Sequence, residues 1–308
     1  MRRLFILILA ILVISMFSIF IARQKTPAVT PDPEKIPVFA SFYPLTFFVG
    51  EIGGDKVAVT NITPTGIEPQ DFEPKPQQLA SLYKAKLLIL NGAGLEPWAD
   101  RIKGDLDRAG VTVVTAASGV ELLTKDGMPD PHIWLDPVWA QRSVLNIRDG
   151  LIRVDPGNEV YYRSNSDNLI VKLTNLDNLY RLSLFNCLQD TIITTHSVFG
   201  YLAKRYKFNE ESLAGFSQDE EPSPQIIAFL VDTIREKNIQ VILSETLMSP
   251  KLSQTIAQET NVRVERFNPL EGLTQEELDK GENYFTIQDV NRKLLMSALQ
   301  CTSPTINL

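Results

Sequence analysis

The stretch IPVFASFYPLTFFVGEIGGDKVAVTNI, residues 36–62, decides the fold of this 308-residue chain. Its ends, IPVFASF (36–42) and KVAVTNI (56–62), are short apolar runs of the kind that forms β-strands, and residues 44–52 between them have a helical pattern. A strand, a helix and a second strand in this order make a βαβ unit, whose two strands are parallel. We therefore expect a parallel sheet with both faces covered by helices.

The same alternation continues along the chain. Before residue 120, the further strand candidates are 86–91 and 111–116, and the further helical stretches are 76–85 and 97–108. After residue 189, the strand candidates are 190–195, 211–216, 239–244 and 262–267, and the helices lie near 197–206, 224–237, 250–259 and 286–300. The pattern predicts two Rossmann-like α/β lobes, each with its own parallel sheet.

Residues 156–185 connect the two lobes. After Pro156 and Gly157 this segment contains no Pro or Gly, and its apolar side chains recur at roughly helical spacing. Pro156 suits the first turn of a helix, where its missing N–H costs nothing. We expect one long connecting helix between an N-terminal lobe of residues 36–155 and a C-terminal lobe of residues 186–308.

Residues 1–23 are expected to be a signal sequence or an N-terminal membrane anchor. Two arginines precede an uncharged apolar run, 4–22, which is nearly long enough to span hydrocarbon. Phe20 interrupts the pattern of small residues at a cleavage site, which favours an uncleaved anchor, and the absence of a polar face argues against a buried core helix. Residues 24–35, with three prolines, form an extended linker. The remainder is therefore expected outside the cytoplasm, in the periplasm or at the outer face of the cytoplasmic membrane.

Charge and cysteine content restrict the partners and the compartment. Because residues 1–23 carry three arginines and no acid, residues 24–308 have a formal charge of −10, against −7 for the whole chain. An acidic body argues against nucleic acid as a partner and suits cations. Cys187 and Cys301 are compatible with one disulfide in an oxidising compartment or with two separate buried thiols, and their spacing does not choose between these. We take the disulfide as the prediction to test.

Only two histidines occur in the chain, His132 and His196. His132 lies in PDPHIWLDP (129–137), a turn-rich segment leading to a helix, and His196 directly follows the strand candidate 190–195. A lone histidine is usually a packing or surface residue. One histidine at an equivalent position in each lobe favours a shared metal site, because ligands bind beyond the carboxyl ends of parallel strands.

Two further loops follow strand candidates and carry carboxylates. The segment 63–80 contains four prolines and four polar side chains of interest, which are Glu68, Gln70, Asp71 and Glu73. The segment FNPLEGLT (267–274) places Glu271 just beyond the last strand of the second lobe. Together with the two histidine loops, these segments are expected to converge on one cleft.

A series of motifs covers essentially all of residues 36–301 in a fixed order: GIEPQDFEPKP, NGAGLEPW, DPHIWLDP, TTHSVFGYLAKRY, EEPSPQ, SETLMSPK, FNPLEGLT and GENYF. The series resembles the zinc/manganese-type solute-binding proteins of ATP-driven metal importers, the ZnuA/AdcA/TroA-like group. The resemblance implies a monomer that binds Zn²⁺ or Mn²⁺ as transported ligand between two α/β lobes. It also implies delivery of the ion to the membrane permease of an ABC transporter.

The resemblance also implies a ligand set. His132 matches the histidine of the family's DPHxW motif, His196 matches the histidine of its T-[SA]-H segment, and Glu271 matches the carboxylate of the NPLE loop. The family's first ligand is the histidine of EPHDFEP, and this chain has Gln70 at that position. The implied metal site is therefore His132, His196, Glu271 and Gln70.

The glutamine is a departure with chemical consequences. An amide oxygen is neutral like imidazole but is a harder and weaker donor, so the preference for Zn²⁺ over Mn²⁺ is expected to shrink. Asp71, Glu68 or a water molecule could take the position of Gln70. The alternative is a site that has lost its metal.

Three glutamates in the motifs allow a functional or a purely structural interpretation. Glu220, Glu221 and Glu245 look exposed, and either support the ligands or contact the permease, or belong to ordinary solvated loops. Three aromatic side chains at motif positions are expected to pack the lobes: Trp98, Trp134 and Tyr201.

Two competing functions remain open. Two histidines and one glutamate with an open position also form a catalytic zinc set. The chain lacks an HExxH helix, an evident general base beside the ligands and a nucleophile elbow, so we do not expect an enzyme. A surface adhesin built on a metal-free version of the fold is supported only by the missing first histidine.

Overall fold

The structure is a computed structural model that describes residues 35–125, 127–216, 222–246 and 251–302. The predicted signal or anchor, residues 1–23, lies outside these residues, as do the linker up to residue 34 and the pair Glu220 and Glu221. Within the part that is described, no helix combines the length and the apolar character needed to cross a membrane.

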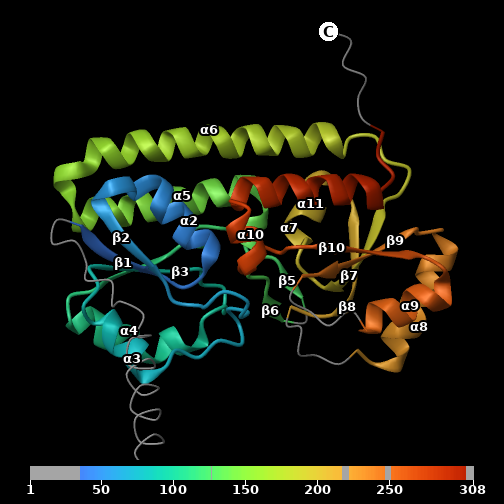
Figure 1. The fold of residues 1–308 in the computed structure, drawn as a ribbon, viewed down its shortest axis with the longest axis horizontal. Coiled ribbons are helices and arrows are strands. Elements are labelled where there is room, and N and C mark those ends of the chain that lie inside the picture. Colours follow the sequence, from blue (N-terminus) through green and yellow to red (C-terminus); the bar gives the residue numbers. More distant parts are fainter. Residues whose placement is uncertain (1–34, 126, 217–221, 247–250, 303–308) are drawn as a thin grey trace, which may run out of the picture. The chain divides into compact units, whose positions relative to one another are not determined.

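The first lobe is built on a parallel sheet (Figure 1). Its strands are β1 (Ile36–Ala40), β2 (Val57–Asn61), β3 (Leu87–Leu90) and β4 (Thr112–Thr115), in the order β2-β1-β3-β4. Helix α2 (Tyr43–Gly53) connects β1 to β2, as the stretch 36–62 predicts. All four side chains of β3 are buried, because helices cover both faces of a parallel sheet.

The second lobe repeats this topology. Its strands are β7 (Thr191–His196), β8 (Asn209–Ala214), β9 (Val241–Glu245) and β10 (Arg263–Phe267), in the order β10-β9-β7-β8, all parallel. Numbered by appearance within its lobe, each sheet has the strand order 2-1-3-4. The chain reverses direction across the sheet between the first and third strands, and this switch point is where ligands bind in open α/β sheets.

Further helices cover both faces of each sheet, namely α3 (Pro76–Leu82), α4 (Pro97–Arg108), α5 (Pro137–Val154), α7 (Gly200–Tyr206), α8 (Pro224–Glu236), α9 (Lys251–Thr260), α10 (Gln275–Asp279) and α11 (Tyr284–Ala298). Figure 1 shows α3 and α4 on one side of the first sheet, with α2 and α5 on the other. In the second lobe, α8 and α9 lie opposite α11. Both predicted α/β lobes are confirmed.

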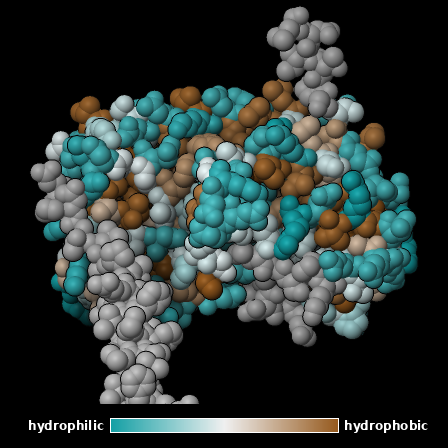
Figure 2. Space-filling view, in the orientation of Figure 1, coloured by the Kyte–Doolittle hydropathy of each residue, from teal (hydrophilic) through white to brown (hydrophobic). Residues whose placement is uncertain are grey.

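A single apolar core runs through both lobes. It includes Val38 of β1, Leu169 of the connecting helix, Leu243 of β9 and Leu295 of α11, all at most 1% exposed. Two smaller clusters lie under α3 and α4 and under α8 and α9. Because the lobes share the main core, the described residues from 35 to 302 form one compact unit. On the face drawn in Figure 2, hydrophobic residues lie in separate spots among hydrophilic ones.

The connecting helix α6 spans Glu159–Ser183 and passes over both sheets (Figure 1). It begins three residues later than Pro156, because Pro156–Asn158 forms a 3-10 turn in which the Asn158 N–H donates to the Asp155 carbonyl. The buried side chains of α6 recur at helical spacing, as shown by Leu169, Leu173 and Leu176. The predicted fold class, two α/β lobes joined by one long helix, is confirmed.

Several elements differ from the sequence expectation. Helix α7 begins at Gly200 rather than residue 197, because the Glu210 carboxylate accepts the backbone N–H groups of Val198 and Phe199 and keeps them out of the helix. The short hairpin of β5 (Thr124–Lys125) and β6 (Met128–Pro129) was not expected. It is too short to show a period of two in the sequence.

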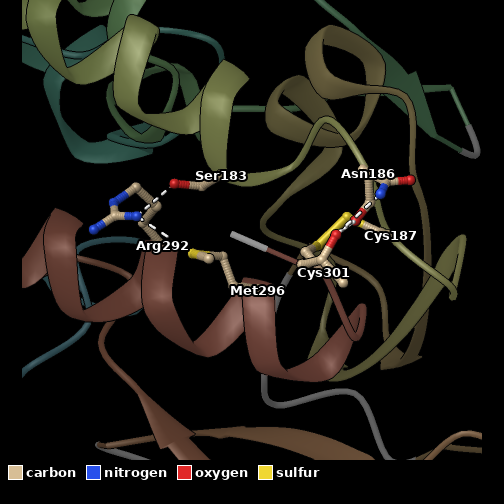
Figure 3. The surroundings of a disulfide bond; sticks show 7 residues. Ser183, Asn186, Cys187, Arg292, Met296 and Cys301 are labelled. Carbon is tan, nitrogen blue, oxygen red and sulfur yellow. Dashed lines mark hydrogen bonds between the residues drawn. A yellow bond between two sulfur atoms is a disulfide. The ribbon is translucent and has the colours of Figure 1, made fainter. Parts of the chain in front are cut away.

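Cys187 and Cys301 form a disulfide, and the alternative of two separate thiols is wrong (Figure 3). The bond joins the segment after α6 to the residue that follows the end of α11 by three positions. Backbone hydrogen bonds pair the same segments, since the Thr302 N–H donates to the Asn186 carbonyl at 2.9 Å and the Leu188 N–H to the Gln300 carbonyl at 3.3 Å. The end of the connecting helix is thus tied to the last helix.

Candidate metal centre

Three predicted ligands, His132, His196 and Glu271, lie together between the lobes. Their candidate ligand atoms all lie within 4.8 Å of one another. Nε2 of His132 is 3.4 Å and Nε2 of His196 is 4.0 Å from Oε1 of Glu271, and the imidazole centroids are 5.4 Å apart. In residues 35–302, apart from the three undescribed segments, no other group of three or more His, Cys, Asp or Glu side chains has this geometry.

The two sheets bring these side chains together. His196 is the last residue of β7, next to β9 at the switch point of the second sheet. His132 comes from the segment before α5, and at the first sheet's switch point Asn91, just after β3, donates its Nδ2–H to the carbonyl of the preceding Pro131 at 3.0 Å. Glu271 follows β10. The predicted convergence of the loops from both lobes is present for these three residues.

The group is buried and unsatisfied. His132 and His196 are fully buried, and Glu271 is 1% exposed. Nε2 of both imidazoles and both carboxylate oxygens of Glu271 have no hydrogen-bond partner among the described residues. Buried polar atoms normally have partners, because leaving them unpaired costs several kcal/mol. A divalent cation between the two nitrogens and the carboxylate would supply the missing partner.

A second carboxylate fixes the orientation of each imidazole. Nδ1 of His132 lies 2.8 Å from Oδ1 of Asp130, and Nδ1 of His196 bonds to the carboxylate of Glu245. An ionised carboxylate only accepts, so each Nδ1 carries the hydrogen and the Nε2 lone pair faces the metal position. The sequence expectation that Glu245 is exposed is wrong. It ends the central strand β9, is fully buried, and supports His196 directly.

Burial and the surrounding carboxylates perturb both histidines. Burial lowers the pKa of His196 to about 3. Burial also acts to lower the pKa of His132, but the carboxylates of Asp130 and Glu271 outweigh it and raise this pKa to about 10. In the metal-free site, the raised pKa of His132 favours one additional proton, on its Nε2, and repulsion from that charge adds to the burial that keeps His196 neutral. The lone pair of the His132 Nε2 becomes available to a metal ion when that proton leaves.

Gln70 lies in the loop between β2 and α3. Its Nε2 donates to Oε2 of Glu68 at 3.0 Å, so the opposite atom, Oε1, is the free end of the amide. This Oε1 is buried and has no partner among the described residues. The loop lies against the Glu271 loop, since a Cβ added to Gly272 would be 3.8 Å from the backbone nitrogen of Gly66. Asp71, the alternative ligand, is an exposed side chain.

Sequence reasoning missed two supporting carboxylates. Asp130 accepts both the backbone N–H of His132 at 2.9 Å and its ring Nδ1–H. The signal that could have found it is the position of the aspartate two residues before the histidine in DPH, since an aspartate often accepts the N–H two residues on. Glu96, within NGAGLEPW, accepts from Ser41 Oγ at 2.6 Å and from the Asn91 N–H at 2.7 Å, and burial raises the pKa of Glu96 to about 6. Glu96 thereby holds the first sheet's switch point together.

The three aromatic side chains at motif positions do pack the lobes. Trp98 lies in the apolar cluster under α3 and α4. Tyr201 of α7 crosses between the lobes, where its hydroxyl donates to the Asp130 carbonyl at 2.8 Å and accepts the Leu123 N–H. Trp134 is 1% exposed and makes a T-shaped contact with Phe42, with the ring centroids 4.7 Å apart.

Known proteins share this fold and much of this sequence. The high-affinity zinc uptake system protein ZnuA of Bacillus subtilis (strain 168) is 35% identical over 281 residues, which are 86% of this chain and 88% of that protein. The chain is 31% identical to the zinc-binding protein AdcA of Streptococcus pyogenes serotype M6, and the match spans 92% of this chain but 60% of that protein's length.

Solved structures agree. The Zn(II)-bound ZnuA-like domain of Streptococcus pneumoniae AdcA superposes with a TM-score of 0.78 and 31% identity, covering 86% of this chain and 99% of that one. The laminin-binding protein Lmb of Streptococcus agalactiae, described as having adhesin and metal transporting activity, gives 0.79 and 30% over the same shares. The model of one protein family matches residues 38–298. Since this match includes both sheets, the connecting helix and all of the candidate ligands, the chain belongs to the ZnuA family, described as zinc-uptake complex component A, periplasmic.

Proposed function

We propose that this chain captures a divalent transition metal ion outside the cytoplasm, Zn²⁺ in preference to Mn²⁺, and delivers it to the permease of an ATP-driven importer. Family membership supports the general part of this proposal, namely that the chain is a solute-binding protein of a metal-uptake system. The observation that carries the proposal is the buried group of His132, His196 and Glu271, whose facing atoms have no partner among the described residues. Two imidazole nitrogens and a carboxylate suit Zn²⁺.

Gln70 completes the ligand set through Oε1. Its amide orientation supports this assignment, because Glu68 accepts from the Nε2 side and leaves only the carbonyl oxygen for a cation. The resulting set of two nitrogens and two or three oxygens is harder than one with three imidazoles. We therefore expect Mn²⁺ to bind as a weaker second cargo.

The remaining features of the proposal concern setting and partners. The protein acts as a monomer at the outer face of the membrane or in the periplasm, held there by residues 1–23, with domain boundaries at residues 155/156 and 185/186. It is not an enzyme. Asp130 and Glu245, the carboxylates beside the two imidazoles, are each engaged by a histidine Nδ1 and so are not free to act as a general base.

The decisive experiment is metal analysis combined with thermal unfolding. The chelator-stripped chain is expected to bind one Zn²⁺ per molecule, and ligand present at a thousandfold excess over Kd stabilises the native state by about 4 kcal/mol. His196→Ala is expected to abolish this metal-dependent stabilisation. A stripped wild-type chain whose melting temperature does not respond to Zn²⁺ or Mn²⁺ would rule the proposal out.

Adhesion is a second candidate, favoured by the likeness to the laminin-binding Lmb structure. A metal-free adhesin is disfavoured by the buried group of His132, His196 and Glu271. Without an ion, its unpaired polar atoms destabilise the fold and gain nothing in return. Binding of the metal-loaded and chelator-stripped chain to immobilised laminin tests this candidate, and no retention of either form would eliminate it.

A further inference from the structure

The backbone that presents Glu271 is in an unfavourable conformation. Leu270, directly before it, has φ of 64°, in the left-handed region that is unfavourable for residues other than glycine. Leu270 is also fully buried. Its N–H donates to Oδ1 of Asn268 at 2.7 Å, which closes a tight turn over residues 268–270. Such a conformation persists only when surrounding contacts enforce it.

One of those contacts comes from the other lobe. The indole Nε1–H of Trp134 donates to the carbonyl oxygen of Pro269 at 2.8 Å, inside the turn and two residues before Glu271. Trp134 itself is fixed, because its own carbonyl accepts the Tyr284 hydroxyl of α11 at 2.6 Å. Its ring lies 5.1 Å from the His132 ring, centroid to centroid. Trp134 therefore contacts the ring of one candidate ligand, His132, and the turn that presents another, Glu271. These two ligands belong to different lobes.

We propose that Trp134 is a positioning residue for the metal site, one that holds Glu271 in register with His132 through the Pro269 carbonyl. The inference rests on the proposed function, since it assigns a role in metal capture. With the indole hydrogen bond in place, the strained turn at Leu270 is maintained and the carboxylate of Glu271 stays within reach of both Nε2 atoms. Without that bond the turn relaxes, and the carboxylate oxygens lose their alignment while the two histidines keep theirs.

The test compares Trp134→Phe with Trp98→Phe. Phenylalanine retains an aromatic ring at either position, and only at residue 134 does the change delete an indole N–H with a hydrogen-bond partner shown in the structure. Trp98 is a matched control, because it is 2% exposed and packs in a different apolar cluster. We expect Trp134→Phe to weaken metal binding by on the order of 10- to 100-fold, as loss of ligand-orienting contacts does elsewhere, and Trp98→Phe to leave affinity unchanged.

The choice of metal separates positioning from general destabilisation. Loss of carboxylate alignment removes an oxygen donor, so affinity for Mn²⁺ is expected to fall more than affinity for Zn²⁺. Competition titrations against a chromophoric chelator measure both affinities. If Trp134→Phe binds Zn²⁺ as tightly as the wild type does, and likewise Mn²⁺, the inference is overturned but the proposed function is left intact. Failure of the wild type to bind either ion instead refutes the proposed function.

A second variant serves if Trp134→Phe does not fold. Tyr284→Phe removes the hydroxyl that holds the Trp134 carbonyl and keeps the ring that packs against Phe48, whose centroid is 4.9 Å away. The same loss of affinity, larger for Mn²⁺ and smaller in size than for Trp134→Phe, is expected. A Tyr284→Phe chain with lower stability but unchanged affinity for both ions would show that the contact is structural only.

Discussion

At the scale of single residues, the site is defined by atoms that lack partners. His132, His196 and Glu271 each have a support on one side, and their facing polar atoms have no hydrogen-bond partner in the part of the chain that the structure describes. The support is a carboxylate for each imidazole and a strained turn for the glutamate. This division leaves the donor atoms aimed at a common point before any ion arrives, so little reorganisation is required on binding.

The residue at position 70 is expected to influence the metal preference. Gln70→His replaces an amide oxygen by an imidazole nitrogen at unchanged formal charge, so Zn²⁺ affinity is expected to rise by roughly tenfold or more while Mn²⁺ affinity changes less. Competition titration of both ions measures this. Asp71→Asn, next to it but exposed, is the control and should change neither affinity. Equal affinities for Gln70→His and the wild type would mean that residue 70 faces away from the ion.

The proton held by the histidine pair predicts the pH dependence of binding. The carboxylates of Asp130 and Glu271 raise the pKa of His132 to about 10, so at neutral pH the metal-free site holds one proton that an entering ion displaces. Affinity should therefore rise by up to tenfold per pH unit from pH 6 to pH 9, rather than level off above the usual histidine pKa of about 6.5. Calorimetry in buffers of different ionisation enthalpy counts the released protons, and a count of zero at pH 7 contradicts the assignment.

At the scale of elements, one glutamate in each lobe accepts backbone N–H groups of the loop that follows a strand of the sheet. Glu210, on β8, accepts the N–H groups of Val198 and Phe199 and so holds the segment between His196 and α7 outside the helix. In the first lobe Glu96 does the same for the Asn91 and Gly92 N–H groups after β3. These loops carry or support the candidate ligands. Hydrogen bonds that hold the loop backbone therefore also help to hold the ligands in position.

Glu210 gives this arrangement a measurable pH signature. Burial raises the pKa of Glu210 to about 7, above the value near 4.3 for an unfolded glutamate. Between these two values the folded chain binds more protons than the unfolded one, so this group's contribution to stability falls as pH rises from about 4.5 to 7 and is then constant. In Glu210→Gln, urea unfolding of the metal-free chain should show a flatter stability profile over that window. An unchanged slope would mean that Glu210 does not titrate there.

At the scale of the whole molecule, one apolar core and one covalent bond hold residues 35–302 together. The main core passes through both lobes, and the connecting helix α6 lies across them. The Cys187–Cys301 disulfide joins the far end of α6 to the segment after α11. Helix α11 also supplies Tyr284 and Gln288, which hydrogen bond to the segment following His132. Contacts far from the ion therefore fix the relation between its ligands.

Loss of the disulfide should lower stability more than metal affinity. The bond spans 114 positions of sequence, and the chain-entropy model gives on the order of 4 to 5 kcal/mol for closing a loop of that size, with measured values often smaller. Cys187→Ser combined with Cys301→Ser should therefore unfold at lower denaturant concentration and still bind one metal ion. Reductant is the matched control, because it should destabilise the wild type and leave the double variant unchanged. Equal midpoints for both chains would contradict the expectation.

Local pattern determined the elements of this protein, and tertiary contact decided their exact ends and the details of its site. The alternation in residues 36–62 predicts a parallel α/β lobe because strand and helix periodicity are local properties. His132, His196 and Glu271 could be chosen because they follow strand ends or turn-rich loops, where parallel sheets place ligands. The burial of Glu245, the start of α7 and the hydrogen bond from Trp134 to Pro269 depend on partners 11 to 135 positions away, which no local pattern encodes. The same reason explains why the cysteine pairing stayed open until the ends of α6 and α11 were seen side by side (Figure 3).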